Sequence, residues 1–266
     1  MRKLLPSLTF LAVAALPAQA EPVRSVSVAY NVDVGPMTMI VVKYALNHSG
    51  DAVEARANIR SNGLSRMFSE YSAKAEGQSR AGQEGMTPVR FRLVREKEDR
   101  KKETSLQWNG PGAITYAPQE KKPERRQRIE QALNAAVADP MTAVLRIGTS
   151  GETPCPSVQQ VFDGRDVYEL SLADKGEGRL DGDAAYRGPV RVCDVSWTPI
   201  AGRAAEKNEP RESYEVSFAP IGELPSGRML WLPVSLTGKL KGIRFDAYVT
   251  KLKAEGGSEG TAASQN

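Results

Sequence analysis

Histidine, aromatic residues and long apolar runs are all scarce in this chain of 266 residues. It contains one histidine, and 6% of its residues are aromatic. A single histidine excludes most histidine-based metal sites and acid–base mechanisms. The remaining composition, 40% hydrophobic and 26% charged, is that of a globular protein. It excludes a disordered polymer and a polytopic membrane protein.

The only apolar run near membrane length lies at the N-terminus. Arg2 and Lys3 precede a mostly apolar stretch from Leu4 to Leu16, and Ala18-Gln19-Ala20 matches the small-x-small rule for cleavage. We interpret residues 1–20 as a secretory signal peptide rather than an anchor, because a membrane span needs roughly 20 apolar residues. The sequence therefore predicts a bacterial periplasmic protein with no stable membrane insertion.

The overall charge does not favour nucleic acid as a partner. The full chain has a formal net charge of +4, and loss of residues 1–20, which hold two basic and no acidic residues, lowers it to +2. A nearly neutral mature chain lacks the strong positive charge of nucleic-acid-binding domains.

Two cysteines, Cys155 and Cys193, fall in the predicted mature chain. An even number of cysteines in an oxidising compartment favours one disulfide. The alternatives have less support, because a redox pair usually has Cys-x-x-Cys spacing. Two cysteines with no nearby histidine also make a poor zinc site.

Alternation of polar and apolar residues dominates the mature chain. It predicts one-sided strands over residues 25–32, 53–60, 89–93, 168–172, 214–218 and 243–249, and residues 39–46, apolar on both faces, predict a more central strand. Turn signals such as Ser49-Gly50-Asp51 and Asp163-Gly164 separate these runs. The pattern predicts a mainly-β fold with a single antiparallel sheet that is strongly curved or spiral, as an open or closed barrel.

One region changes to a helical period. Apolar residues recur at helical spacing from Pro123 to Val137, and Asp139-Pro140 has the form of an N-cap followed by the first residue of a second short helix. We expect this helical insert near 123–147 to pack on the concave face of the sheet. No domain boundary is evident, so we expect one β-rich domain over 21–253 and a disordered tail over 254–266.

Candidate catalytic and metal-binding residues are few. His48 lies in the polar segment Asn47-His48-Ser49, which we interpret as a turn at the surface. The glycine- and acid-rich stretch 176–182 has neither EF-hand nor phosphate-loop spacing, so we interpret it as a solvated loop. The chain has no Gly-x-Ser-x-Gly elbow and no convincing pair of carboxylates. We therefore predict no catalytic residue, no enzyme activity, no metal and no cofactor.

Two segments are rich in basic side chains. Residues 95–102 hold five basic and three acidic residues, and residues 120–128 hold five and two. We favour a solvated hairpin tip and an exposed helix start. The alternative is a patch that faces anions such as phospholipid or lipopolysaccharide head groups. Its residues are Lys121, Lys122, Arg125, Arg126 and Arg128.

The three tryptophans, Trp108, Trp197 and Trp231, each lie in or beside a predicted strand. We expect them to belong to the core or to line a cavity. Trp197 shares a strand face with Cys193, so it is expected to pack near the disulfide.

Several segments, taken in order, resemble an exported bacterial family, domain of unknown function 3108. The segments are Tyr30 to Gly35, Ser61-Asn62-Gly63-Leu64, Asp139-Pro140-Met141-Thr142-Ala143, residues 162–170, Cys193 to Gly202, Leu232-Pro233-Val234 and a final strand near 245–252. They span nearly the whole mature chain. The resemblance implies a periplasmic β-rich protein with a curved or spiral sheet, similar in style to lipoprotein carriers, and it supplies no catalytic residue.

Two functions follow as hypotheses. The first is a non-catalytic envelope-maintenance protein that binds a lipid or a lipidated partner in an apolar cavity, because one-sided strands in a chain of this length can curl around one. The second is a scaffold that binds envelope proteins or peptidoglycan through its surface or a sheet edge. An envelope hydrolase is the least supported alternative.

Overall fold

The computed structural model describes residues 21–63, 70–117, 120–181, 185–207, 212–240 and 242–256. The predicted signal peptide lies outside these residues. Thirteen strands within them form one antiparallel sheet in the order β7-β6-β5-β4-β3-β2-β1-β13-β12-β11-β10-β9-β8. The strands are β1 (Ser25–Val34), β2 (Met37–Ser49), β3 (Ala52–Ser61), β4 (Tyr71–Gly82), β5 (Gly85–Lys97), β6 (Arg100–Trp108), β7 (Ile114–Tyr116), β8 (Ser157–Phe162), β9 (Val167–Leu180), β10 (Gly188–Ala201), β11 (Glu212–Glu223), β12 (Met229–Leu240) and β13 (Ile243–Glu255).

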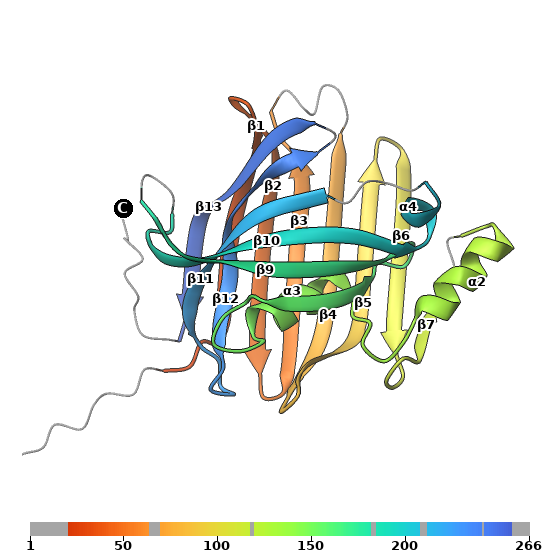
Figure 1. Cartoon of the computed structure of the whole chain (residues 1–266), viewed down its shortest axis with the longest axis horizontal. Helices are drawn as coiled ribbons and strands as arrows, with labels where there is room; N and C mark the ends of the chain where they lie inside the picture. Colours follow the sequence, from red (N-terminus) through yellow and green to blue (C-terminus); the bar gives the residue numbers. More distant parts are fainter. Residues whose placement is uncertain are drawn as a thin grey trace, which may run out of the picture.

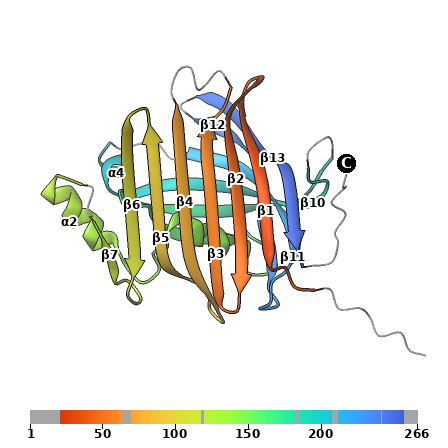
Figure 2. The ribbon, with the colours of Figure 1, turned by 180° about the vertical axis from the view of Figure 1, so that it is seen from behind.

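The sheet folds over on itself into two layers. Strands β1 to β6 lie side by side as a rear layer, and β9 and β10 cross them in front (Figure 1). The view from behind shows the same crossing with the rear layer toward the reader (Figure 2). The end strands β7 and β8 pair with β6 and β9 but not with each other. The predicted strongly curved sheet is therefore confirmed, and the sheet does not close.

Three short helices accompany the sheet: α2 (Pro123–Ala132), α3 (Pro140–Gly148) and α4 (Arg203–Glu206). Helix α3 lies between the two layers, where it contacts β4, β5, β8 and β12 (Figures 1 and 2). The expectation of a helix on the concave face is met by α3. Helix α2 instead lies outside the layers near β7, and Ile129 is its buried residue (Figure 1). None of the described helices is long and apolar enough to cross a bilayer.

The start of α3 has the predicted N-cap. The side chain of Asp139 accepts hydrogen bonds from the backbone N–H of Met141 at 2.9 Å and of Thr142 at 3.0 Å. The hydroxyl of Thr142 also donates to Asp139 and lies 2.8 Å from the hydroxyl of Ser79 on β4. These bonds satisfy backbone donors that the first turn of a helix leaves without partners, and they fix α3 against the rear layer.

The core of the domain draws on both layers. It includes Phe91 and Leu106 from the rear layer, Leu145 from α3, and Leu232 from β12, all at most 2% exposed. On β4 the side chains facing α3 are small, and a Cβ at Gly77 would overlap with Met141. The apolar faces predicted from alternation therefore meet around α3, and burial of this surface stabilises the fold.

Three local predictions were wrong. His48 lies inside β2, paired with Val53, and the turn begins only at Gly50. Strand β9 continues to Leu180 and pairs with β10 through most of the stretch interpreted as a loop, because a bulge absorbs its extra residue. Strand β13 continues to Glu255, paired with β1, so the predicted tail started too early. Residues 257–266 lie outside the described part.

Candidate functional site

The inner face of the rear layer is mostly apolar, and only part of it is covered. In the lower half, Val28, Leu46 and Val53 are at most 2% exposed. In the upper half, the strands continue with apolar side chains on the same face, since every second residue of a strand points to the same face. The partly exposed residues are Tyr30, Val32, Ile40, Val42, Ile59, Tyr71 and Leu93.

The facing wall comes from the front layer. The ring of Tyr168 lies against Trp197, and the ring of Tyr214 lies against Phe245, each with a centroid distance of 5.8 Å. Trp197 shares a face of β10 with the buried Cys193, four positions away. Tyr214 shares a face of β11 with the buried Val216, two positions away. These aromatic side chains are also partly exposed. Aromatic and aliphatic side chains therefore line both walls of one space.

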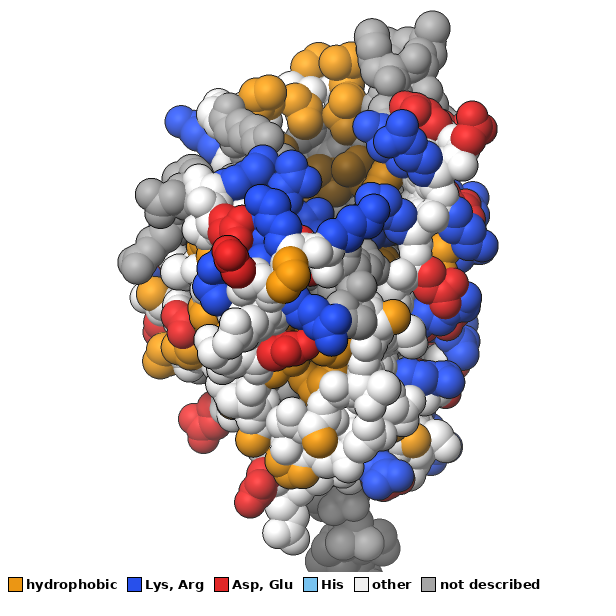
Figure 3. Space-filling view, turned by 90° about the vertical axis from the view of Figure 1, so that its right-hand side faces the viewer, with side chains coloured by type: hydrophobic (Ala, Val, Ile, Leu, Met, Phe, Trp, Pro, Cys, Tyr) orange, Lys and Arg blue, Asp and Glu red, His pale blue; other side chains and the backbone are white. Residues whose placement is uncertain are grey.

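We call this space the upper hollow and define it by these two sets of side chains. Figure 3 shows the side of the molecule on the right of Figure 1, with a hollow in its upper part that has apolar side chains on its floor and Lys and Arg side chains on both sides. The hairpin β5–β6 and helices α2 and α4 lie on this side (Figure 1). The hollow is thus an apolar space with a basic rim.

Burial keeps three tyrosines of the inner faces in the uncharged form. Burial raises the pKa of Tyr30, Tyr44 and Tyr168 well above the ordinary value, because a phenolate would lose its hydration there. The Tyr30 hydroxyl donates to the backbone carbonyl of Pro233 at 2.9 Å and so joins β1 to β12. The Tyr44 hydroxyl is buried and has no hydrogen-bond partner among the described residues.

The basic residues of the segment 120–128 are mostly paired. Arg125 forms an ion pair with Glu120 at 2.6 Å and another with Glu206 of α4. Arg128 also contacts Glu206, and the hydrogen bond from Arg125 lowers the pKa of that carboxyl. Arg126 pairs with Glu130 of its own helix at 2.9 Å. Of the proposed anion-facing residues, Lys121 and Lys122 are exposed, whereas the three arginines already hold carboxylates.

The basic segment 95–102 forms the tip of the hairpin β5–β6. Sequence reasoning treated it as one cluster, but the strand pleat divides it between two faces. Arg95 follows Phe91 and Leu93 on the inner face, and it lies opposite Ala73 of β4 and Lys102 of β6. Arg95 is the functional candidate that the sequence analysis missed, although the alternation Phe91, Leu93, Arg95 carried the signal.

The tryptophans separate in space. Trp197 lines the upper hollow. Trp108 lines a different cavity of about 950 Å³, which is bordered by the turn between β4 and β5 and by the end of β6. We call it the lower cavity, because that turn lies at the lower end of the molecule in Figure 1. Trp231 packs beside the cluster that holds Cys155, Cys193 and Ile147 of α3. Each tryptophan thus lies in the core or against a cavity, and two different cavities are involved.

The lower cavity has a mixed lining in which three arginines, Arg80, Arg146 and Arg228, accompany apolar side chains. Arg146 donates to the backbone carbonyls of Met86 and Ala136, each at 2.7 Å, and Arg228 donates to the carbonyl of Gln83. These guanidinium groups therefore hold together the chain segments at this end of the sheet. The described residues contain no cluster of three or more His, Cys, Asp or Glu side chains able to hold a metal ion.

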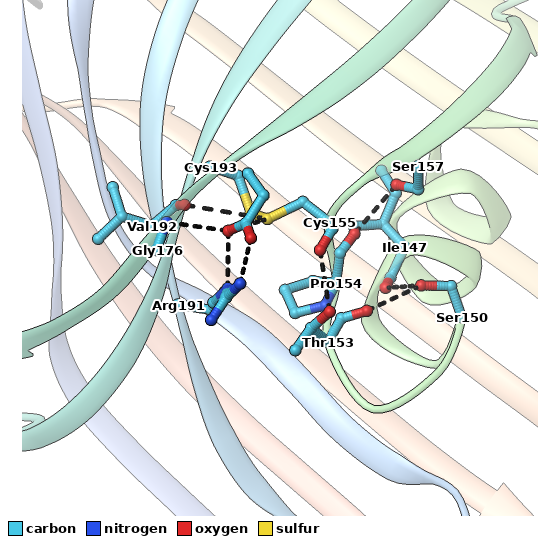
Figure 4. The surroundings of a disulfide bond; sticks show 11 residues. Ile147, Ser150, Thr153, Pro154, Cys155, Ser157, Gly176, Arg191, Val192 and Cys193 are labelled. Carbon is cyan, nitrogen blue, oxygen red and sulfur yellow. Dashed lines mark hydrogen bonds and ion pairs between the residues drawn. A yellow bond between two sulfur atoms is a disulfide. The ribbon is translucent and has the colours of Figure 1, made fainter.

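The predicted disulfide is present between Cys155 and Cys193. Figure 4 shows that it joins the segment after α3 to β10, with Arg191 nearby. The side chain of Arg191 forms an ion pair with Asp174. The two cysteines are 1% and 0% exposed. A buried structural disulfide is typical of proteins outside the cytoplasm.

Comparison with known proteins tests the resemblance. Residues 25–220 match the family model described as protein of unknown function, DUF3108. The chain belongs to the DUF3108 family. A crystal structure of a beta-barrel-like protein of domain of unknown function DUF1849 from Brucella abortus is similar with a TM-score of 0.48 and 9% sequence identity, over 88% of this chain and 99% of that one. No curated protein matches the chain.

Proposed function

We propose that this DUF3108 protein is a non-catalytic periplasmic protein of the bacterial envelope that binds a lipid, or the acyl chains of a lipidated partner, in the upper hollow. The observation that carries the proposal is the set of large apolar side chains that stay partly exposed on both walls of one concave space. A monomeric protein normally covers such surface, so an apolar concave site with few polar groups supports ligand binding.

The chemistry of the walls favours acyl chains over polar ligands. The tyrosine hydroxyls are uncharged, and the aromatic rings of the front wall offer flat apolar surfaces. The carboxyl group of Asp139 beside α3 is 0% exposed and is already used as a helix cap. The walls therefore favour hydrocarbon chains.

The envelope location rests on two independent features. The sequence predicts a signal peptide over residues 1–20, and the buried disulfide belongs with an oxidising compartment. A binding protein in the periplasm would shield acyl chains from water between membranes, which agrees with a role in envelope maintenance.

The alternative, docking of an envelope protein or peptidoglycan through a sheet edge, has less support. Edge strand β7 is three residues long. The other edge strand, β8, already bonds to the chain at Ala138, whose N–H donates to the carbonyl of Gln160 and whose carbonyl accepts from the N–H of Phe162. Both edges therefore offer little backbone for an added strand.

Binding of an uncharged fluorescent acyl probe to the purified mature protein tests the proposal. Ile59→Gln places a polar side chain in the hollow, and Arg60→Gln changes the next residue on the outer face of the same strand. An apolar side chain of this size contributes about 1.5 kcal/mol when buried, so we expect Ile59→Gln to weaken the probe roughly tenfold. Arg60→Gln should bind as the wild type does.

Extraction of the protein purified from its host, followed by mass spectrometry, identifies the bound molecule. A bound lipid or acylated peptide supports the proposal. Absence of probe binding by the wild type, or equal binding by the Ile59 and Arg60 variants, would refute it.

A further inference from the structure

Arg95 and Lys97 are the basic side chains that alternation places on the inner face of β5, and of the two Arg95 is less exposed and lies closer to the apolar wall. Arg95 is therefore the candidate for contact with a ligand in the upper hollow. It follows Phe91, which is 1% exposed, by four positions on a regular stretch of strand, so both side chains point to the same face. Its neighbours across the strands are Ala73, which is 1% exposed, and Lys102. The guanidinium group is therefore placed at the edge of the apolar wall rather than on the outer surface.

Arg95 also differs from other arginines of the sheet in its partners. Its Nε atom is buried, and no atom of the described residues accepts a hydrogen bond from it. On the outer face of the same strand, Arg92 binds both carboxylate oxygens of Glu103, at 2.8 and 3.1 Å. A buried donor without an acceptor opposes folding, and native structures satisfy nearly all such groups. An acceptor supplied by a ligand would satisfy this one.

The surroundings of Arg95 are basic. Lys97, Arg100 and Lys102 lie at the tip of the same hairpin, with Glu98 and Asp99 in its turn. The Lys and Arg side chains on both sides of the hollow in Figure 3 extend this charge. A net positive charge beside a space with apolar walls attracts a ligand of the opposite charge.

We propose that the ligand of the upper hollow is an anionic amphiphile, with its acyl chain along the apolar walls and its carboxylate or phosphate group bound by Arg95. This inference rests on the proposed function, because it assigns the charged end of the same ligand. A planar guanidinium group binds both kinds of anion through two parallel hydrogen bonds, which an ammonium group cannot reproduce.

Matched ligands separate the anionic group from the chain. Hexadecanoate, hexadecyl phosphate and hexadecanol share one chain, and each is measured by displacement of the uncharged probe from the mature protein, with the acids ionised. Inorganic phosphate is measured alone by calorimetry. We expect at least one of the two anions to bind about tenfold or more tightly than hexadecanol, because hydrogen bonds to charged groups are the strong ones. Inorganic phosphate should bind far more weakly than either.

Two variants assign the effect to Arg95. Arg95→Gln removes the inner-face charge closest to the apolar wall, and Lys101→Gln removes a charge from the outer face of the same hairpin, where Lys101 pairs with Glu96 at 3.8 Å. We expect Arg95→Gln to lose the preference for the anion while hexadecanol binding and the urea midpoint stay at wild-type values. Lys101→Gln should keep the preference.

The outcomes distinguish this inference from the proposed function. If no ligand displaces the probe, or the probe does not bind, the proposed function fails. If hexadecanol binds as tightly as the anions, or Arg95→Gln weakens all three ligands equally, the role of Arg95 is refuted while acyl binding stands. Phosphate binding as tight as that of the amphiphiles would also refute it, since the site would then recognise a free anion.

Discussion

The carboxyl group of Asp139 is expected to be the most sensitive single polar group of the fold. It is 0% exposed and accepts hydrogen bonds from two backbone N–H groups of α3 and from the hydroxyl of Thr142. Loss of an N-cap costs about 1 kcal/mol. Buried donors left without an acceptor cost about 1–3 kcal/mol more. We therefore expect Asp139→Ala to lower the free energy of unfolding by roughly 3 kcal/mol.

Asp139→Asn is the matched control, because an amide oxygen can accept the same backbone hydrogen bonds. Burial raises the pKa of Asp139 despite its hydrogen bonds. The native carboxyl therefore keeps a proton at pH values where the unfolded one has lost it, and the stability it contributes at low pH is lost as pH rises through its folded pKa. Asn does not titrate, so Asp139→Asn should gain stability relative to the wild type as the pH rises above about 4.

Urea unfolding followed by tryptophan fluorescence measures both effects, with the three proteins compared over a series of pH values. The reasoning is refuted if Asp139→Ala unfolds at the wild-type urea concentration. It is also refuted if Asp139→Asn is destabilised as much as Asp139→Ala, since the cap would then require the charge.

Three further predictions concern stability. Replacement of both Cys155 and Cys193 by Ala should lower the free energy of unfolding by about 4 kcal/mol, the chain-entropy value for a loop of this length, and a urea titration that shows a loss below about 1 kcal/mol would contradict it. Gly148→Ala should lower the melting temperature, because its Cβ would overlap with a backbone carbonyl of β12, whereas Gly151→Ala, with open space around it, should not. Burial lowers the pKa of His48, so the unfolded state binds the proton more readily, and the urea midpoint should fall as the pH drops from about 7.5 to about 5.5. His48→Gln should remove that dependence, and an unchanged slope in this variant would exclude His48 as its source.

Strands with strong apolar alternation were predictable, and those with small inner residues were not. Residues 53–60 and 89–93 fall in β3 and β5 as expected. Strand β4 was missed because its inner positions are Ala73, Ala75, Gly77 and Ser79, which carry little apolar signal. These residues are small because α3 lies directly on them, a fact that depends on a helix far away in the sequence.

The candidate site shows the same division. Alternation identified inner-face residues such as Ile59, but it did not show which of them a second layer would cover. The basic segment 95–102 was recognised as a cluster, and its alternation with Phe91 indicated the face of Arg95, but only the curvature of the sheet places that face toward a second layer. The pairing of Arg125 with Glu206 across 81 positions was equally beyond a local pattern.

The amino-acid sequence by itself determined the elements that depend on neighbours along the chain: one-sided strands, the Asp139 cap of α3 and the single cysteine pair available for a disulfide. Tertiary structure alone decided that α3 fills the lower half of the curved sheet and leaves the upper half of its apolar face open. The physical reason is that covering an apolar face requires a surface of matching shape from a distant segment. A residue's own neighbours in the sequence carry no information about where that surface ends.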